Sequence, residues 1–260
     1  MSPHSRVPAR LTRRDLLGLA GMAAAGSGLA CLGTVLGYLV VDRLSRAPQP
    51  TLLASPVAPN ATRLKQIDRP GILLRQDWGA REPDHQAPNE TGFFSADNPD
   101  GWRVYDEDLR TVYRTVVIHH SVLYESDDLS TMRAIQNQHM DLRGWADIAY
   151  HFGVGQSGQV FEGRSLAVRG THVEGFNTGS VGVVFLGDFQ VNYPTPLQLE
   201  AGRRLIDWLA LRLELTHLAG HSDFNGTTDC PGQHLRELLP MLAQSARLAL
   251  GTGGYLQAQG

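Results

Sequence analysis

Cys230 and His221 are the residues whose chemistry most needs an explanation. They lie nine positions apart, and the segment between them contains an Asn225-Gly226 turn signal. A histidine and a lone cysteine whose chain turns back between them can share a metal ion, and a thiolate with imidazoles suits Zn²⁺. Three protein ligands leave the fourth position for water, as hydrolysis requires. The alternative is a surface His221 and a small, buried Cys230.

A third ligand has to come from another part of the chain. His119 and His120 lie near the end of the apolar, β-branched run TVVIHHS at 115–121, which predicts a buried strand. Side chains alternate along a strand, so Val117 and His119 share one face, while Ile118 and His120 share the other. Only one of the two imidazoles faces a given site, and the pattern alone does not distinguish them.

The elements around these residues predict one α/β domain over residues 63–250. Buried strands interleaved with amphipathic helices are typical of a central mixed β-sheet flanked by helices. Gly155-Gln-Ser-Gly158 predicts a hairpin between two strands. Residues 82–110 are acidic and turn-rich and predict a long surface excursion. The predicted strands are 115–121, 149–154, 159–162 and 180–186, and the predicted helices are 128–140, 196–215 and 233–250.

Composition restricts the classes of function. The chain has 260 residues, 42% of them hydrophobic, which is enough for one sizeable core. Residues 1–46 hold six Arg and two Asp, which leaves 17 basic and 24 acidic residues in the remainder. Because nucleic-acid binding depends on Lys and Arg against phosphate, we expect no nucleic-acid partner. Lys65 is the only lysine of the chain, so a mechanism with a catalytic lysine is nearly excluded.

Residues 1–46 are predicted to be a signal or a membrane anchor. The Arg13-Arg14 pair resembles a twin-arginine signal. The uncharged residues 16–41 would span roughly 39 Å as a helix, more than the ~30 Å hydrocarbon core of a bilayer. The arginines before this span place the N-terminus inside and the domain outside, so we expect an extracytoplasmic, membrane-anchored protein. Residues 47–62 contain four prolines and predict a linker, and residues 251–260 predict a flexible tail.

Several further motifs occur in an order that identifies a family. They are Gln76-Asp-Trp-Gly-Ala80, Val116–Ser121, Gly144–Phe152, Val160–Arg164, His172–Gly187 and Gly220–Gly232. Together they resemble the peptidoglycan recognition protein family, which shares its fold with the type-2 zinc N-acetylmuramoyl-L-alanine amidases. The resemblance covers about residues 70–245. It implies a hydrolase that cleaves the amide bond between N-acetylmuramic acid and L-alanine in peptidoglycan.

The resemblance also implies the ligands of the metal. The family's ligand is the first histidine of its His-His-Ser/Thr motif, which selects His119 over His120. His119, His221 and Cys230 would then bind Zn²⁺.

Further roles are implied for residues around that metal. The resemblance places Tyr150 beside the zinc-activated water and Thr228 where its hydroxyl donates to the substrate carbonyl or the oxyanion, so both are predicted to be catalytic. His172 and Asn177 fall in the stretch that lines the groove for the peptide stem, and they are predicted to bind substrate.

The sequence also departs from the family pattern. The usual Gly-Arg-Gly-Trp reads Gly163-Arg164-Ser165-Leu166, and the pair Ala167-Val168 matches neither the lysine-type nor the diaminopimelate-type stem pattern. The excursion at 82–110 has no counterpart. A non-catalytic module that binds peptidoglycan is the alternative function. Because non-cleaving family members commonly lose the cysteine ligand, Cys230 favours the enzyme.

Overall fold

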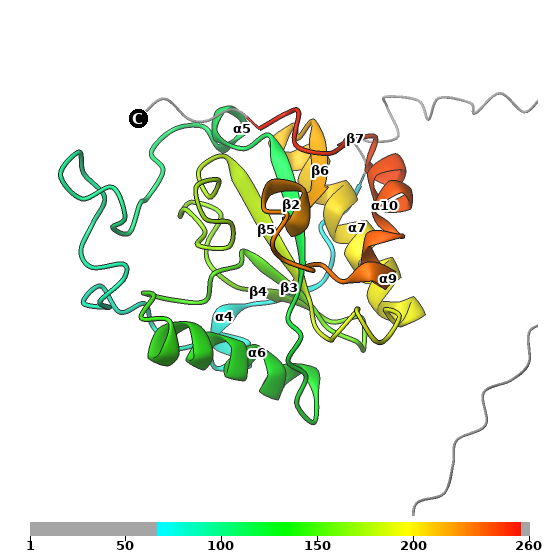
Figure 1. Cartoon of the computed structure of the whole chain (residues 1–260), viewed down its shortest axis with the longest axis horizontal. Coiled ribbons are helices and arrows are strands. Elements are labelled where there is room, and N and C mark those ends of the chain that lie inside the picture. The colour runs from blue at the N-terminus through cyan, green and yellow to red at the C-terminus, as the bar shows by residue number, and fades with distance from the viewer. Residues whose placement is uncertain (1–66, 256–260) are drawn as a thin grey trace, which may run out of the picture. The chain divides into compact units, whose positions relative to one another are not determined.

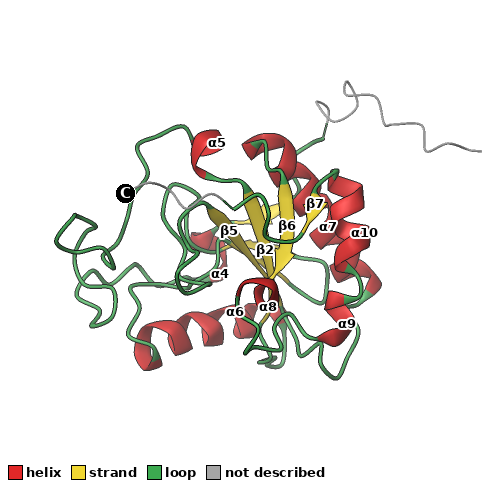
Figure 2. Cartoon of the chain, turned by 45° about the horizontal axis from the view of Figure 1, so that its top comes forward, coloured by secondary structure: helices red, strands yellow, loops and turns green. Residues whose placement is uncertain are grey.

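The strands of the domain form one mixed sheet. The computed structural model describes residues 67–255, and within that range seven strands are hydrogen-bonded side by side (Figures 1 and 2). The strands are β1 (Ile72–Leu73), β2 (Thr115–His120), β3 (Phe152–Val154), β4 (Val160–Glu162), β5 (Ser180–Phe185), β6 (His217–Gly220) and β7 (Ala249–Leu250). Their order is β1-β4-β3-β5-β2-β6-β7. Only β3 and β4 are antiparallel, joined by the predicted hairpin, so the predicted mixed sheet is confirmed.

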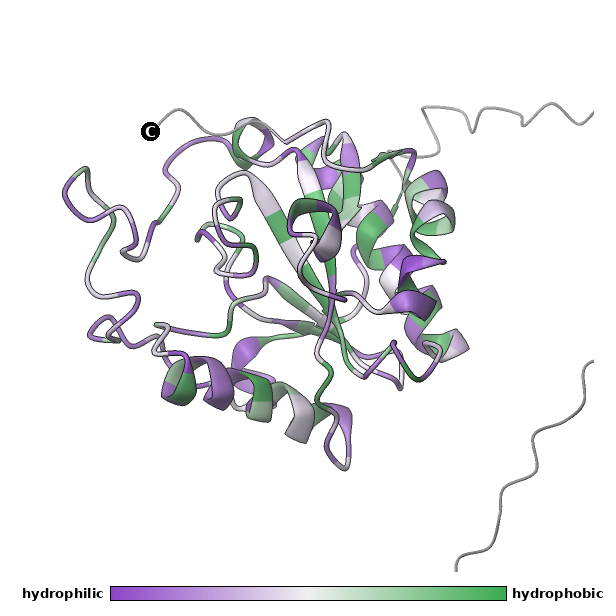
Figure 3. Ribbon diagram, in the orientation of Figure 1, coloured by the Kyte–Doolittle hydropathy of each residue, from purple (hydrophilic) through white to green (hydrophobic). Residues whose placement is uncertain are grey.

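Helices cover both faces of this sheet. They are α4 (Arg75–Trp78), α5 (Leu109–Val112), α6 (Asp128–Asn137), α7 (Pro196–Leu213), α8 (His221–Phe224), α9 (Gln233–Arg236) and α10 (Leu239–Ala246), and a π-helical turn, η1 (Gln138–Leu142), continues α6. Val116 and Ile118 of β2 belong to the core beneath α7 and α10. The other face carries the core of α4 and α6. In Figure 3 the central strands are mostly apolar, whereas α6 mixes apolar and hydrophilic residues.

Side-chain caps fix where the two longest helices begin. Asp127 precedes α6 and accepts a hydrogen bond from the Ser130 amide at 2.7 Å. Thr195 precedes α7 and accepts from the Gln198 amide at 3.1 Å, with Pro196 in the first turn, where its missing N–H has no cost. Each such cap stabilises a helix by about 1 kcal/mol.

Two predicted elements have the wrong boundaries, and three short strands, β1, β6 and β7, were not predicted. The helix predicted at 233–250 is divided into α9 and α10, because Pro240 cannot continue a preceding helix, and Ala249–Leu250 forms a strand beside β6. The strand predicted at 149–154 begins only at Phe152. Of the missed strands, β6 matters most for the site, because the predicted ligand His221 directly follows it.

The excursion at 82–110 is irregular, as predicted, and is held by isolated β-bridges such as Val104 with Val168. Beyond β7, Tyr255 lies against Phe176 and Phe224 with ring centroids 5.2 and 5.6 Å away, so the first part of the predicted tail contacts the domain. The predicted signal or anchor and the linker lie outside the described residues. Between residues 67 and 255, none of the helices has the length and apolar character needed to cross a bilayer.

Candidate metal centre and groove

Two central strands bring two of the predicted ligands together. β2 lies between β5 and β6, and Ile118 of β2 pairs with Gly220 at the end of β6. His119 is therefore the next residue on one strand, and His221 is the first residue after the other. Because Val116 and Ile118 face α7 and α10, alternation turns His119 to the opposite face, as predicted.

Cys230 reaches these imidazoles on the loop after α8. Its carbonyl accepts a hydrogen bond from the Ser222 amide at 2.8 Å, which fixes the loop against α8. The backbone N–H of His120 donates to the Cys230 sulfur at 3.4 Å. His120 itself points to the other side of the strand, where its Nδ1 accepts from the Phe189 amide at 3.2 Å. Of the two adjacent histidines, only His119 faces the site.

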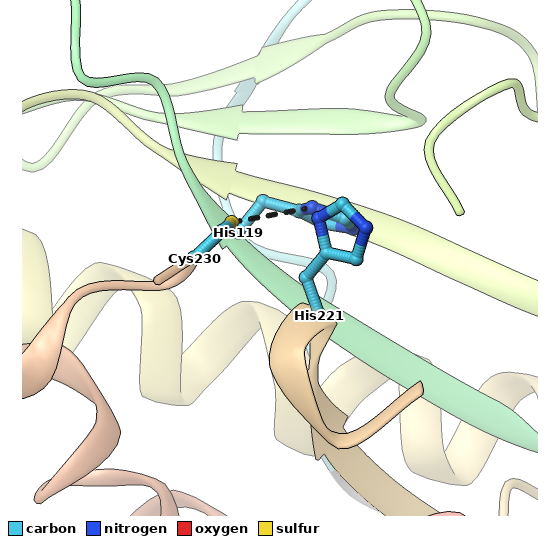
Figure 4. A group of neighbouring side chains, drawn as sticks. All are labelled: His119, His221 and Cys230. Carbon is cyan, nitrogen blue, oxygen red and sulfur yellow. Dashed lines mark hydrogen bonds between the residues drawn. The ribbon is translucent and has the colours of Figure 1, made fainter. Parts of the chain in front are cut away.

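The three side chains converge on one point (Figure 4). Ligand atoms of His119, His221 and Cys230 all lie within 4.8 Å of one another. The Nδ1 atom of His119 is 3.6 Å from the Cys230 sulfur. A tetrahedral zinc ion with ordinary Zn–N and Zn–S bond lengths separates its nitrogen and sulfur ligands by about 3.6 Å. The donor set and its spacing therefore fit zinc.

Burial sets the protonation of these groups. It holds the pKa of His119 well below its usual value, with neighbouring imidazoles adding to the effect, and burial also lowers the pKa of His221. Both rings are thus neutral, which is the form that binds metals. In the metal-free protein, burial raises the pKa of Cys230 to about 12 against the opposing N–H of His120. Metal binding therefore has to displace a thiol proton.

His172 fixes which nitrogen of His119 faces the site. The Nε2 atom of His172 lies 3.4 Å from the Ser180 carbonyl, which can only accept, so this nitrogen carries the proton. The Nδ1 atom of His172 is then an acceptor for His119 Nε2, which is 3.0 Å away. The lone pair of His119 Nδ1 is left facing Cys230. This orienting contact was not predicted for His172, which was expected to bind substrate.

The remaining predicted site residues are Tyr150, Asn177 and Thr228, and each has different contacts near the metal centre. The Tyr150 ring lies beside His119, with centroids 5.0 Å apart, and it lines the groove. Asn177 also lines the groove, and its Oδ1 accepts from the amides of His172 and Val173 at 2.6 and 2.7 Å. Thr228 accepts from the Cys230 amide at 3.2 Å, so it shapes the turn that presents the sulfur.

The centre opens into a groove of about 820 Å³, a volume typical of ligand sites. His221, Tyr150, His172 and Asn177 line it beside residues that were not predicted. The residues that were not predicted include Asp100, Val122, Arg143, Trp145 and Arg169. Trp145 and Arg143 lie in or next to a recognised motif, which was a usable signal, whereas no pattern marks Asp100 as a groove residue.

Comparison with known proteins shows to which family the chain belongs. Residues 109–233 match the N-acetylmuramoyl-L-alanine amidase family. Peptidoglycan-recognition protein LB of Drosophila melanogaster is 34% identical over 63% of this chain and 65% of its own length. Peptidoglycan-recognition protein SC2 of Drosophila simulans is 36% identical over 63% of this chain and 82% of its own length. Human peptidoglycan recognition protein 3 is 38% identical, but only 46% of its length is matched.

Solved structures show that the fold is shared as well. The structure of wild-type Drosophila PGRP-LB superimposes with a TM-score of 0.54 and 28% identity, covering 73% of this chain and 99% of that one. A point mutant of the same protein in complex with tracheal cytotoxin gives a TM-score of 0.53 and 29% identity, covering 68% and 96% of the two chains. The chain therefore belongs to the peptidoglycan recognition protein and type-2 N-acetylmuramoyl-L-alanine amidase family.

Proposed function

We propose that the protein is a zinc-dependent N-acetylmuramoyl-L-alanine amidase that hydrolyses peptidoglycan. The convergence of His119, His221 and Cys230 at a ligand-sized groove is the observation that carries this proposal. The relative crystallised with tracheal cytotoxin supports a muropeptide as the ligand.

His119, His221 and Cys230 would hold the ion, with one negative charge among them. Bound zinc in such a three-ligand site activates water near neutral pH and polarises a carbonyl group. Because His221 lines the groove while His119 and Cys230 are only 1% and 8% exposed, substrate approaches the centre from the His221 side. His172 keeps His119 in the tautomer that can ligate.

Tyr150 and Thr228 would act on the charge that develops at the scissile carbonyl. Burial, and then the nearby Cys230, raises the pKa of Tyr150, so its hydroxyl remains a hydrogen-bond donor across the neutral range. The Thr228 oxygen accepts from the Cys230 amide, which leaves the hydroxyl proton free to be donated. Donors placed at a developing oxyanion are among the larger contributions to hydrolytic catalysis.

The decisive experiment combines metal analysis with turnover. The full chain, purified in detergent, should contain about one zinc ion and release stem peptide from N-acetylmuramoyl peptides, as measured by mass spectrometry. Cys230→Ser should lose both properties. Cys31→Ser, the same change at the chain's other cysteine, is the matched control and should keep both. Full activity of Cys230→Ser would refute the zinc mechanism, and muropeptide binding without cleavage by the wild type would support the non-catalytic module instead.

We also propose that residues 1–46 export the folded domain and anchor it outside the cytoplasm, through membrane contact at 16–41. The support is the arginine pair followed by an uncharged stretch of spanning length. Replacing Arg13 and Arg14 together by Lys should keep the protein in the cytoplasmic fraction. Unchanged export of that variant would exclude the twin-arginine route.

A further inference from the structure

The excursion at 82–110 connects the two walls of the groove. On one wall, the Asn89 side chain donates to the Arg143 carbonyl at 2.7 Å, just after η1. On the other wall, the Tyr105 amide donates to the Ala167 carbonyl at 2.7 Å. Both Figure 1 and Figure 2 show the excursion at the left of the domain and α8 nearer the middle. Asn89, Glu90 and Asp100 of the excursion line the same groove as His221, so the excursion forms part of the groove wall, on the side away from α8.

A buried ion pair holds this boundary in place. The carboxylate of Glu90 receives both terminal nitrogens of Arg164, at 2.5 and 2.9 Å, and the Ala146 amide at 3.0 Å. Glu90 is 3% exposed and Arg164 is 1% exposed. The Arg164 guanidinium also lies 4.6 Å from the ring centroid of Trp102, a second residue of the excursion. These contacts make the excursion a fixed wall.

Two charges of opposite sign face this end of the groove. Asp100 comes from the excursion and Arg143 from the segment after η1, and both line the same cavity. Both residues are exposed, and neither side chain has a hydrogen bond or ion pair within residues 67–255. A carboxylate and a guanidinium that have no partner in this part of the protein are suited to a ligand that carries an ammonium and a carboxylate.

We propose that the excursion makes this groove selective for free, uncross-linked stem peptides. The last residue of such a stem carries a free carboxylate, which Arg143 would bind, and a free side-chain ammonium, which Asp100 would bind. Three extended residues reach about 10 Å, so a third stem residue extends well beyond the scissile bond toward this end. Cross-linking through the side-chain amine forms an amide and removes its charge, and extension of the stem removes the free carboxylate.

The test uses three N-acetylmuramoyl tripeptides that end in lysine, and it rests on the proposed amidase activity. One tripeptide is unmodified, one is acetylated on the ε-amine, and one ends in an amide. In the wild type, kcat/KM should be about 5- to 10-fold higher for the unmodified peptide than for either other peptide, as one charged contact predicts. Asp100→Asn should abolish discrimination against acetylation. Arg143→Gln should abolish discrimination against the amide. Glu107→Gln removes the same charge from the excursion outside the groove lining and should keep both preferences.

A second measurement separates this inference from the amidase proposal. Calorimetry with Cys230→Ser gives the binding constants of the same three peptides without turnover. If the wild type cleaves none of the peptides but the same preferences appear in binding to Cys230→Ser, the amidase proposal fails and the inference stands. Equal kcat/KM in the wild type together with equal binding to Cys230→Ser for all three peptides would overturn the inference.

Discussion

His119 Nε2 lies 3.0 Å from His172 Nδ1, and the Ser180 carbonyl sets the direction of this contact. Replacing His172 by Phe keeps a ring of similar shape but removes the acceptor. We expect zinc affinity to fall about 10- to 100-fold, as is usual when a partner that orients a ligand is lost. Competition with a chromophoric chelator gives the affinity, and the visible spectrum of the cobalt form shows whether the coordination geometry changes.

His217→Phe is the control for that variant, because this imidazole at the start of β6 contacts the Thr216 hydroxyl and takes no part in the metal centre. Wild-type metal affinity and an unchanged cobalt spectrum in His172→Phe would show that the contact between the two imidazoles does not position His119.

Tyr150→Phe isolates a single hydroxyl next to the metal centre. The ring is retained, so the packing against His119, with centroids 5.0 Å apart, should survive. We expect kcat to fall on the order of 10²-fold through loss of a donor to the oxyanion. Zinc content should equal that of the wild type. A kcat within about twofold of the wild type would assign Tyr150 to packing alone.

Glu90→Gln tests how firmly the excursion is held. The change leaves the Arg164 guanidinium, whose side chain is 0% exposed, without its charge partner. Breaking a buried pair in this way costs about 3–5 kcal/mol in the free energy of unfolding. Urea denaturation followed by circular dichroism measures this cost.

The exposed pair of Arg81 and Asp141 provides the matched comparison for Glu90. These side chains are 45% and 54% exposed and lie 2.8 Å apart. Asp141→Asn should cost less than about 1 kcal/mol. Equal losses in Asp141→Asn and Glu90→Gln would mean that the buried pair does not anchor the excursion.

Two buried imidazoles should make the protein sensitive to acid. Burial lowers the pKa of His139 to about 3 and that of His151 to about 4. The Nδ1 atoms of both rings accept backbone N–H groups, at 3.0 Å in each case, which requires the neutral form. Unfolded histidine takes up a proton near pH 6.5. Between pH 6.5 and about 4 the unfolded chain therefore binds more protons, and the free energy of unfolding falls as the pH falls.

This acid sensitivity is measurable by urea titrations of the chelator-treated protein at several pH values. His139→Gln removes one of the two groups, so its stability should change less steeply across the same acidic window. A slope equal to that of the wild type would show that His139 is already protonated in the folded state.

The convergence of the three proposed ligands was largely predictable from the sequence, because they lie in local patterns. Alternation along β2 puts His119 and His120 on opposite faces, the family resemblance selects His119, and the turn at Asn225-Gly226 explains how Cys230 returns to His221. The contact between His119 and His172 was not predictable from the sequence. It depends on two backbone positions, Gly170 and Gly182, that lie directly against the His172 ring. A Cβ on Gly170 or Gly182 would lie 2.5 or 2.6 Å from the His172 ring. Only the absence of side chains at both positions lets the ring lie there.

The excursion was predictable only as a long surface segment. Its anchoring depends on a pair 74 residues apart, Glu90 and Arg164, and no periodicity relates them. An isolated acid in a turn-rich stretch is normally solvated, so composition alone cannot indicate that this one is buried. The charged end of the groove follows from that anchoring and was missed for the same reason.

The three proposed ligands are attached to the fold in unequal ways. His119 and His221 stand at the ends of β2 and β6, whereas Cys230 arrives on a loop whose backbone is held by Ser222. Exchanging the sulfur for a hydroxyl removes one proposed ligand, while an oxygen still offers an acceptor to the His120 amide of β2. On the proposed mechanism, an amidase and a binding protein that does not cleave therefore differ on this scaffold by one residue.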